Sequence, residues 1–386
     1  MKTVFVLLFI LLVHCVFAAD PLVVFFIDTT FEEYSGDAMI VCTPGGRHYV
    51  IDGGDMSTYP PVWDCGEDRV LPILDSLGVT YLEGVVGTHL HADHVGGLIS
   101  VYNTLPVVTA YDSGWPYGGT WTYETYLEAI MNNGSEFVTP RRGDILNWGP
   151  ELTVEVIHPV DPLSPSNINN SSIVIRLTYD EVSFIFTGDL ETDGGEDVVL
   201  GALSTGEIDD ISADVLKVGH HGSYTSTCTL WLVEINPSIA AICVGAGNPY
   251  GHPHAEVINR LNDRDITIYR TDLDGTFYIS SDGQGVYYDS MPPTGGGGPA
   301  SIDEFAVYPS PATSVVTFAW DATDGQSSSI MVFNLNGEKI LDVNAESGSY
   351  TWNLSTVDGM ASPGLYAVVF RTSGGETCTE YFAVSR

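Results

Sequence analysis

Histidines and carboxylates gather in one short segment of this 386-residue chain. Residues 88–97 read THLHADHVGG and contain His89, His91, Asp93 and His94. In an extended segment His89 and His91 face the same side, and a following turn presents Asp93 and His94 beside them. Imidazole and carboxylate suit zinc, and also manganese or iron. The spacing therefore predicts a site for two adjacent cations.

More residues of these types follow along the chain, each beside an expected strand or helix. Residues 186–189 read FTGD and end in Asp189, and residues 217–223 read KVGHHGS with His220 and His221. Residues 252–254 read HPH, and this pair of histidines is interpreted either as a substrate-facing loop or as an ordinary helix-entry loop. Three further single residues are noted: Asp52 in a DGG turn, His158 beside Pro159 as a strand cap or a metal-supporting residue, and His48 as a structural histidine.

The elements that must position these residues alternate between strands and helices. Strands are expected at 22–28, 37–43, 47–52, 84–87, 153–157, 172–178, 183–187, 215–218 and 240–244, and helices at 69–78 and 255–261. This alternation predicts an α/β body with layered sheets. Residues 291–300, MPPTGGGGPA, have the composition of a linker. The short strands and turns of residues 301–386 predict a small β-sandwich tail.

The composition limits the possible functions. Lys and Arg number 13 against 50 Asp and Glu, which gives a net charge of −37 and argues against a basic-groove DNA binder. A phosphodiester substrate stays open, because a bound metal can invert the local field. Near the start of the sequence, Lys2 is followed by an apolar run at 4–17. This pattern predicts a signal peptide over residues 1–18 and an exported protein. In an oxidising compartment, Cys42–Cys65 and Cys228–Cys243 bridges are permitted.

The HxHxDH segment followed by Gly-Gly resembles the metallo-β-lactamase superfamily. The DGG turn at 52–54, the FTGD at 186–189 and the KVGHHGS at 217–223 match further landmarks in order. The resemblance implies a four-layered αβ/βα sandwich with a metal site at its edge. Residues 169–172, NNSS, and 248–254, NPYGHPH, are similar to the ComEC-type branch, which includes the hydrolase domain of a DNA-uptake channel and phosphorylcholine esterases.

The resemblance also implies a role for each matching residue. His89 and His91 would bind one metal, Asp93 and His94 the other, Asp189 would bridge both, and a bridging hydroxide would attack the substrate. One of His220 and His221 would be the last ligand, with His221 favoured, and Asp93 and His220 would be the catalytic residues. Asp52 would orient a metal histidine, or serve as a plain turn aspartate, and the implied substrate-binding residues are Asn170, Ser172, His252 and His254.

One landmark of the superfamily is missing from its expected place. The usual third-motif histidine is replaced by residues 169–172, so a single functional metal remains an alternative to two. Zinc is the expected metal, with manganese as the alternative.

The tail shows a second resemblance. Residues 307–313, VYPSPAT, then 332–339, VFNLNGEK, then 363–369, PGLYAVV, are similar to the C-terminal sorting domain of the type IX secretion system. This implies a secreted or cell-surface protein whose tail is recognised by that secretion machinery. A carbohydrate-binding or adhesive β-module is the alternative for the tail.

Together these observations predict four parts: a signal peptide at 1–18, a metallo-β-lactamase-like hydrolase at 19–290, a linker at 291–300 and a sorting domain at 301–386. The predicted function is that of a secreted, metal-dependent phosphodiesterase, either an extracellular nuclease or a phosphocholine-type esterase. The alternatives are a hydrolase of lactones, β-lactams or other esters, and a non-enzymatic surface binding protein. Aromatic residues at 115–126 are interpreted as a wall over the site or as simple packing.

Overall fold

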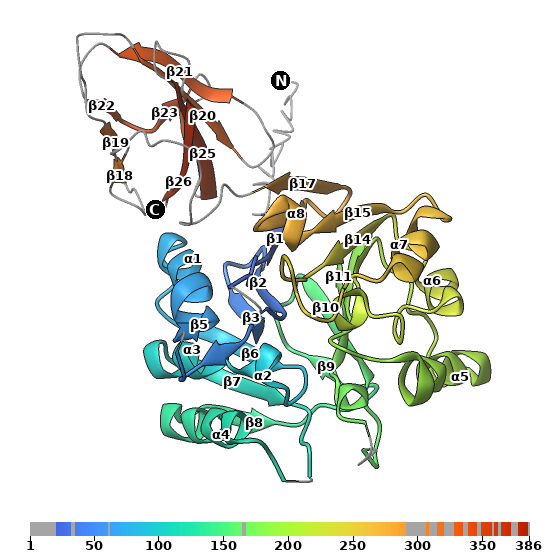
Figure 1. Cartoon of the computed structure of the whole chain (residues 1–386). Helices are drawn as coiled ribbons and strands as arrows, with labels where there is room; N and C mark the ends of the chain where they lie inside the picture. The colour runs from blue at the N-terminus through green and yellow to red at the C-terminus, as the bar shows by residue number, and fades with distance from the viewer. Residues whose placement is uncertain are drawn as a thin grey trace, which may run out of the picture.

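Two β-sheets packed face to face form the body of the protein (Figure 1). The computed structural model describes residues 21–31, 35–60, 62–116, 118–163, 167–290, 306–308, 315–319, 328–334, 339–345, 349–356, 359–361, 364–371 and 377–384. The expected signal peptide and linker lie outside the described residues. No helix in the described part is both long and apolar enough to cross a membrane.

The first sheet has eight strands in the order β17-β16-β1-β2-β3-β6-β7-β8. Neighbours from β3 to β8 pair in parallel, and the other pairs are antiparallel. The strands are β1 Leu22–Phe26, β2 Ala38–Cys42, β3 His48–Gly53, β6 Leu82–Gly87, β7 Val107–Asp112, β8 Glu136–Val138, β16 Phe277–Ser281 and β17 Val286–Ser290. A short pair, β4 Met56–Ser57 and β5 Trp63–Asp64, lies outside this sheet.

The second sheet has seven strands in the order β15-β14-β13-β12-β11-β10-β9. Neighbours from β12 to β15 pair in parallel, whereas β9 to β12 pair antiparallel. The strands are β9 Ile145–Leu146, β10 Leu152–His158, β11 Val174–Tyr179, β12 Val182–Phe186, β13 Val215–Lys217, β14 Ile239–Ile242 and β15 Thr267–Arg270.

Helices cover the outer face of each sheet. Side chains alternate along a strand, so Val24 of β1 packs between the sheets while Phe25 packs on the outer side. The helices beside the first sheet are α1 Leu71–Ser76, α2 Ala92–Val95, α3 Leu98–Thr104 and α4 Trp121–Asn133. Those beside the second are α5 Asp197–Thr205, α6 Thr229–Ile235 and α7 Ala255–Asn262, and α8 Thr271–Asp274 follows β15. The order αβ/βα confirms the predicted fold class.

The described part of the tail is all-β, as predicted. One sheet has the order β18-β19-β22 and the other β21-β20-β25-β26, around a core that includes Phe318, Trp352 and Phe370. The strands are β18 Ala306–Tyr308, β19 Val316–Ala319, β20 Ser328–Asn334, β21 Lys339–Ala345, β22 Ser349–Trp352, β23 Ser355–Thr356, β24 Gly359–Met360, β25 Gly364–Arg371 and β26 Thr377–Val384.

The four described cysteines of the body form no disulfide bridge. Cys42, Cys65, Cys228 and Cys243 are all free, so neither permitted disulfide forms. Cys243 packs between the sheets, whereas the Cys228 sulfur accepts a bond from the amide of Trp231 at the start of α6.

The aromatic stretch at 115–126 belongs mainly to packing. Tyr123 and Tyr126 of α4 are buried in the outer core of the first sheet, whereas Trp121 is 59% exposed. Helix α4 at Trp121–Asn133 was not predicted from the sequence, whereas packing was one of the two interpretations of its aromatic residues.

Candidate metal centre

The histidine and carboxylate side chains meet where parallel strands end. Asp52 lies in β3 and the segment 88–94 follows β6, its parallel neighbour in the first sheet. Asp189 follows β12, and the turn Gly219–Gly222 follows β13, its parallel neighbour in the second sheet. Because the carboxyl ends of parallel neighbours meet at one edge, residues far apart in sequence converge there.

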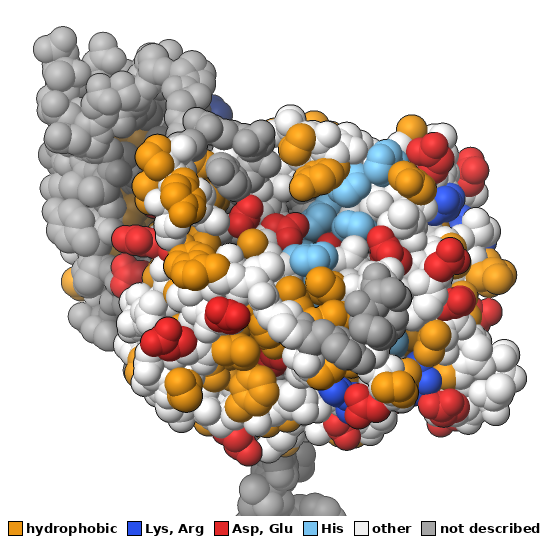
Figure 2. Space-filling view, turned by 60° about the horizontal axis from the view of Figure 1, so that its bottom comes forward, with side chains coloured by type: hydrophobic (Ala, Val, Ile, Leu, Met, Phe, Trp, Pro, Cys, Tyr) orange, Lys and Arg blue, Asp and Glu red, His pale blue; other side chains and the backbone are white. Residues whose placement is uncertain are grey.

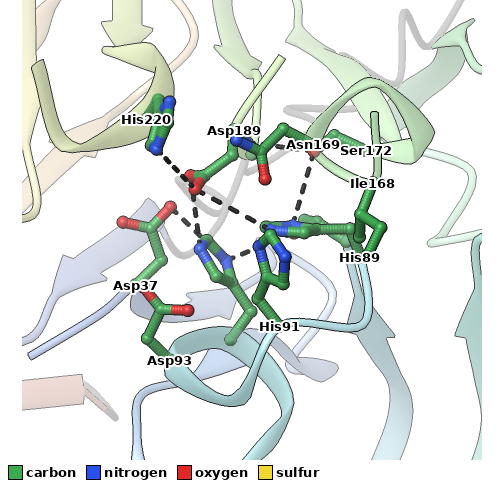
Figure 3. Close-up of polar contacts among 12 residues, drawn as sticks. Asp37, His89, His91, Asp93, Ile168, Asn169, Ser172, Asp189 and His220 are labelled. Atoms are coloured by element: carbon green, nitrogen blue, oxygen red, sulfur yellow. Dashed lines mark hydrogen bonds and ion pairs between the residues drawn. The ribbon is translucent and has the colours of Figure 1, made fainter. Parts of the chain in front are cut away.

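Asp189 lies at the centre of this cluster (Figure 3). Its Oδ1 is 3.2 Å from Nε2 of His94. Its Oδ2 is 3.6 Å from Nε2 of His221 and 3.8 Å from Nε2 of both His89 and His220. Four imidazole nitrogens from two sheets therefore face one buried carboxylate.

Asp52 fixes the orientation of His94. Its Oδ2 is 2.8 Å from Nδ1 of His94, and both of its oxygens accept bonds of 2.8 Å from Thr88. With Nδ1–H donating to Asp52, the Nε2 of His94 points toward Asp189. Burial opposes protonation of His94, but Asp189, Asp52 and Asp93 outweigh it and hold its pKa well above the ordinary value. The site is therefore strongly attractive to positive charge.

Ser172 and Asn170 support the loop that carries Asp189. The Ser172 hydroxyl accepts a bond of 3.0 Å from the amide of Asp189. The Asn170 side chain accepts from the amide of Glu191 at 2.9 Å and donates to the carbonyl of Asp193 at 2.7 Å. Ser172 is fully buried, and neither residue is among those lining the cavity described below. The structure thus places both expected substrate-binding residues behind the candidate metal ligands.

A buried ion pair that was not predicted from the sequence lies beside the site. Asp37 lies just before β2, and its Oδ2 contacts Nζ of Lys217, the last residue of β13. Its Oδ1 is 3.1 Å from Nδ1 of His221, and Lys217 also donates to the carbonyl of Gly188 at 3.2 Å. Burial would lower the pKa of Lys217, but Asp37 outweighs this and raises it. The Lys in the KVGHHGS segment was a signal that could have pointed to a buried acidic partner.

The two adjacent histidines of the second sheet have different environments. His221 is nearly buried, with its Nδ1 donating to the carbonyl of Cys243 at 3.0 Å and its Nε2 3.3 Å from Asp93. The His220 side chain is more exposed, and its Nδ1 is 3.2 Å from Glu191. The hydrogen bond from His220 lowers the pKa of Glu191 to about 2. Glu191 is therefore ionised and holds the His220 ring in place.

A cavity of about 710 Å³ opens above the cluster. It is lined by Ser35, Asp55, His91, Ala92, Asp93, Thr120, Asp189, His220, His221, Val244, Asn248, Pro249, Tyr250 and His252. Figure 2 shows histidines gathered in this hollow with acidic side chains beside them. The expected pair at 252–254 is divided: His252 lines the cavity, whereas His254 is the N-cap residue just before α7 and its ring accepts a bond from the amide of Tyr224.

The donor set fits divalent cations. Among the buried atoms without a hydrogen-bond partner are Nε2 of His94, Nε2 of His221 and Oδ1 of Asp189. Such atoms are costly unless something pairs with them, and a cation does so. Three-donor groups that could hold an ion include His89, His94 and Asp189, and also Asp93, His94 and His221. His91 is half-buried, with Nδ1 3.0 Å from Nε2 of His89.

The two remaining noted histidines lie away from these donors. His158 is buried, and its Nε2 donates to the carbonyl of Asn170 at 2.9 Å. His158 is the last residue of β10 and stabilises the segment of Asn170, and it contacts no candidate metal ligand. His48 begins β3 and is half-buried, with its amide bonded to Glu83.

Comparison with known proteins gives two family matches. A family model described as the Metallo-beta-lactamase superfamily matches residues 32–245, and one described as a Secretion system C-terminal sorting domain matches residues 306–384. ComE operon protein 3 of Bacillus subtilis (strain 168) is 33% identical over 255 residues, 62% of this chain and 31% of that protein. Competence protein ComA of Neisseria gonorrhoeae is 28% identical, over 64% of this chain and 31% of that protein. The chain thus spans less than a third of the length of either relative.

Solved structures give weaker likenesses. A diphosphatase from the PhnP family has a TM-score of 0.39 at 12% identity, covering 68% of this chain and 98% of that chain. A long form RNase Z from yeast has a TM-score of 0.36 at 10% identity, covering 93% of this chain and 61% of that chain. Scores this low carry no weight for the fold or the function of this chain.

Proposed function

Because the chain belongs to the metallo-β-lactamase superfamily, we propose that it is an exported hydrolase that cleaves phosphodiesters with the help of two divalent cations, zinc or alternatively manganese. The observation that carries the proposal is the convergence of four imidazole Nε2 atoms on Asp189 at the floor of an open cavity. The similarity to competence proteins of the ComE and ComA type supports a phosphodiester over a lactam as the substrate.

The residues divide into holders of the cations and residues that act on the substrate. His89 and His91 would hold one cation and Asp93, His94 and His221 the other, with Asp189 shared by both. When bound, such a pair supplies Lewis acidity and a nucleophile derived from water.

Residues at the cavity wall would then act on the substrate. The more exposed His220, oriented by Glu191, would face it, and His252 lies beside it with ring centroids 5.5 Å apart. Either imidazole can exchange a proton with a departing oxygen. Asp93 borders both the cavity and the donor groups, so it can serve the substrate as well as a cation.

The C-terminal sorting domain indicates an exported protein that reaches the cell surface or the medium. We propose that residues 1–18 are removed as a signal peptide, that 19–290 form the hydrolase, and that 291–300 join it to a tail handled by the type IX secretion machinery. Fusing residues 1–18 to the start of a reporter and residues 301–386 to its end tests this. A reporter retained inside cells of a type IX-competent host would contradict it.

The catalytic proposal is tested on the purified protein with bis-p-nitrophenyl phosphate. We expect about two metal ions per chain and turnover that is lost on chelation and regained with zinc or manganese. Asp189→Ala and Asp93→Ala should remove turnover, and the Asp189 variant should also lose bound metal. Phosphodiester turnover that survives in Asp189→Ala, or metal-loaded protein that cleaves lactones and no phosphodiester, would refute the proposal.

A further inference from the structure

We infer that the site takes a phosphodiester with a single phosphate, carrying a nucleoside whose base stacks on Tyr250, and that it disfavours long polynucleotides. This inference rests on the proposed phosphodiesterase function. It is carried by two observations on the cavity: no Lys or Arg is among its described lining residues, and a row of flat rings leads out of it.

The charge around the cavity is unsuited to a polyanion. Among the described residues, no Lys or Arg lines the cavity, whereas Asp55, Asp93 and Asp189 do. Figure 2 shows the Lys and Arg side chains of this face lying away from the histidine-lined hollow. Lys217, the cation near the ligands, is fully buried and committed to Asp37.

Several of the described arginines near the second sheet are bound to other groups as well, and Arg260 donates to the carbonyls of Ser226 and Thr227. Arg176 pairs with Asp210, Arg142 with Glu207 and Arg270 with Asp272. Proteins gain affinity for nucleic acid by neutralising several phosphates with Lys and Arg. Because the cavity lining carries Asp55, Asp93 and Asp189 and the chain has a net charge of −37, we expect phosphates beyond the one at the metal centre to be repelled.

Flat rings form a row from the metal centre to the rim. The His220 and His252 rings lie 5.5 Å apart, and the Tyr250 ring stacks on His252 at 5.7 Å with an angle of 25° between planes. Tyr250 is 73% exposed, so its outer face is free for another ring. A quaternary ammonium group needs several ring faces around one point, whereas a single exposed stacked face suits a planar base.

The loop that carries Tyr250 is braced before substrate arrives. The Asn248 side chain donates to the carbonyls of Gly245 at 2.9 Å and His252 at 2.7 Å, and it accepts from the amide of His252 at 3.0 Å. These three bonds close the loop around Tyr250. A pre-set platform loses little conformational freedom on binding, which favours a specific subsite over incidental exposure.

The test compares three phosphodiesters on the metal-loaded full chain. These are the dinucleotide thymidylyl-3′,5′-thymidine, glycerophosphocholine, which has no flat ring, and an oligothymidylate of about 20 nucleotides. We expect the dinucleotide to have the highest kcat/KM per bond. Raising the salt concentration should leave the dinucleotide rate unchanged and increase the oligomer rate, because salt screens repulsion.

Variants of Tyr250 test whether its ring stacks on the base of the substrate. Tyr250→Ala should lower kcat/KM for the dinucleotide by about 5- to 100-fold, and Tyr250→Phe should restore it, since stacking needs only the ring. Tyr224→Ala is the matched control, because Tyr224 is 60% exposed and does not line the cavity. In ligand-observed NMR of the chelated protein, thymidine should bind the wild type and the Tyr224 variant but not Tyr250→Ala.

The outcomes separate the inference from the proposed function. Preference for the oligomer with a rate that falls steeply with salt, or equal losses for all substrates in Tyr250→Ala, would overturn the inference and leave a phosphodiesterase. Preference for glycerophosphocholine that depends on Tyr250 would assign the rim to a cationic alcohol and also overturn it. Metal-loaded protein that cleaves none of the three would refute the proposed function, and the inference with it.

Discussion

Replacing Lys217 by Met is the most informative single change to the buried framework of the metal centre. Lys217 is 1% exposed, and its ammonium group contacts Asp37 and the carbonyl of Gly188. Methionine keeps the length of the side chain but leaves the Asp37 carboxylate buried without its main partner. Removing one member of a buried pair costs about 3–5 kcal/mol, and we expect a loss of that size in the free energy of unfolding.

A second substitution separates the cost of the unpaired Asp37 charge from the cost of the changed packing at residue 217. Asp37→Asn added to Lys217→Met removes the uncompensated carboxylate, so the double variant should be more stable than Lys217→Met alone. The coupling between the two sites should be about 1–3 kcal/mol. Lys339→Met is the matched control, because Lys339 makes an exposed pair with Asp342 and should cost less than about 1 kcal/mol.

Urea unfolding of the chelated protein measures these free energies without the contribution of bound metal. Hydrogen exchange of peptides from β12 and β13 assigns the transition to the body, not to the tail. A loss below about 1 kcal/mol for Lys217→Met, or strict additivity in the double variant, would show that the pair is not the ionised, buried interaction described here.

Three other predictions concern the same framework. Asp52→Asn should weaken metal binding by about 10- to 100-fold in competition with a chelator, because it removes the acceptor that orients His94, and unchanged affinity would contradict this role. Adding a saturating chelator to the wild type should lower the melting temperature, and much less so in Asp189→Ala, which has already lost its shared ligand. Burial lowers the pKa of His158 to about 4. Between pH ~6.5 and 4 the unfolded chain therefore binds more protons than the folded chain, so the free energy of unfolding decreases as the pH is lowered, by about 3 kcal/mol at pH 4. His158→Asn should flatten that part of the stability profile, and an unchanged slope would refute the assignment.

The sequence locates the segments that carry the candidate metal donors because these segments are local. The four candidate donors of residues 89–94 lie in the segment after β6 and in the short helix α2 that follows it, so their proximity needs no knowledge of the rest of the chain. The expected strands at 22–28, 183–187 and 215–218 each match an observed strand within a few residues. Alternating or continuous apolar runs are strong signals, and the core between the sheets is built from them.

The supporting residues were not predictable in the same way. Asp37 acquires its role only because β2 and β13, which are far apart in sequence, bring it against Lys217 and His221. Asn170 and Ser172 were expected at the substrate, but their short side chains are used up by the amides and carbonyls of the Asp189 loop. Such roles depend on which backbone N–H and C=O groups lack a backbone partner in the folded chain, and the sequence pattern does not predict those groups.

The orientations of the adjacent side chains of His220 and His221 depend on the fold and could not be predicted from the local sequence. Both have φ values in the left-handed region, at +50° and +53°, and their rings diverge with an angle of 67° between planes. His221 is drawn inward by the carbonyl of Cys243 and by Asp37, whereas His220 is drawn toward Glu191. The partner of His221 follows β14 and the partner of His220 lies in the loop after β12, so the different orientations of these two neighbouring histidines are set by the edge of the sheet. That difference supports His221 as the proposed ligand and His220 as the residue that faces the substrate.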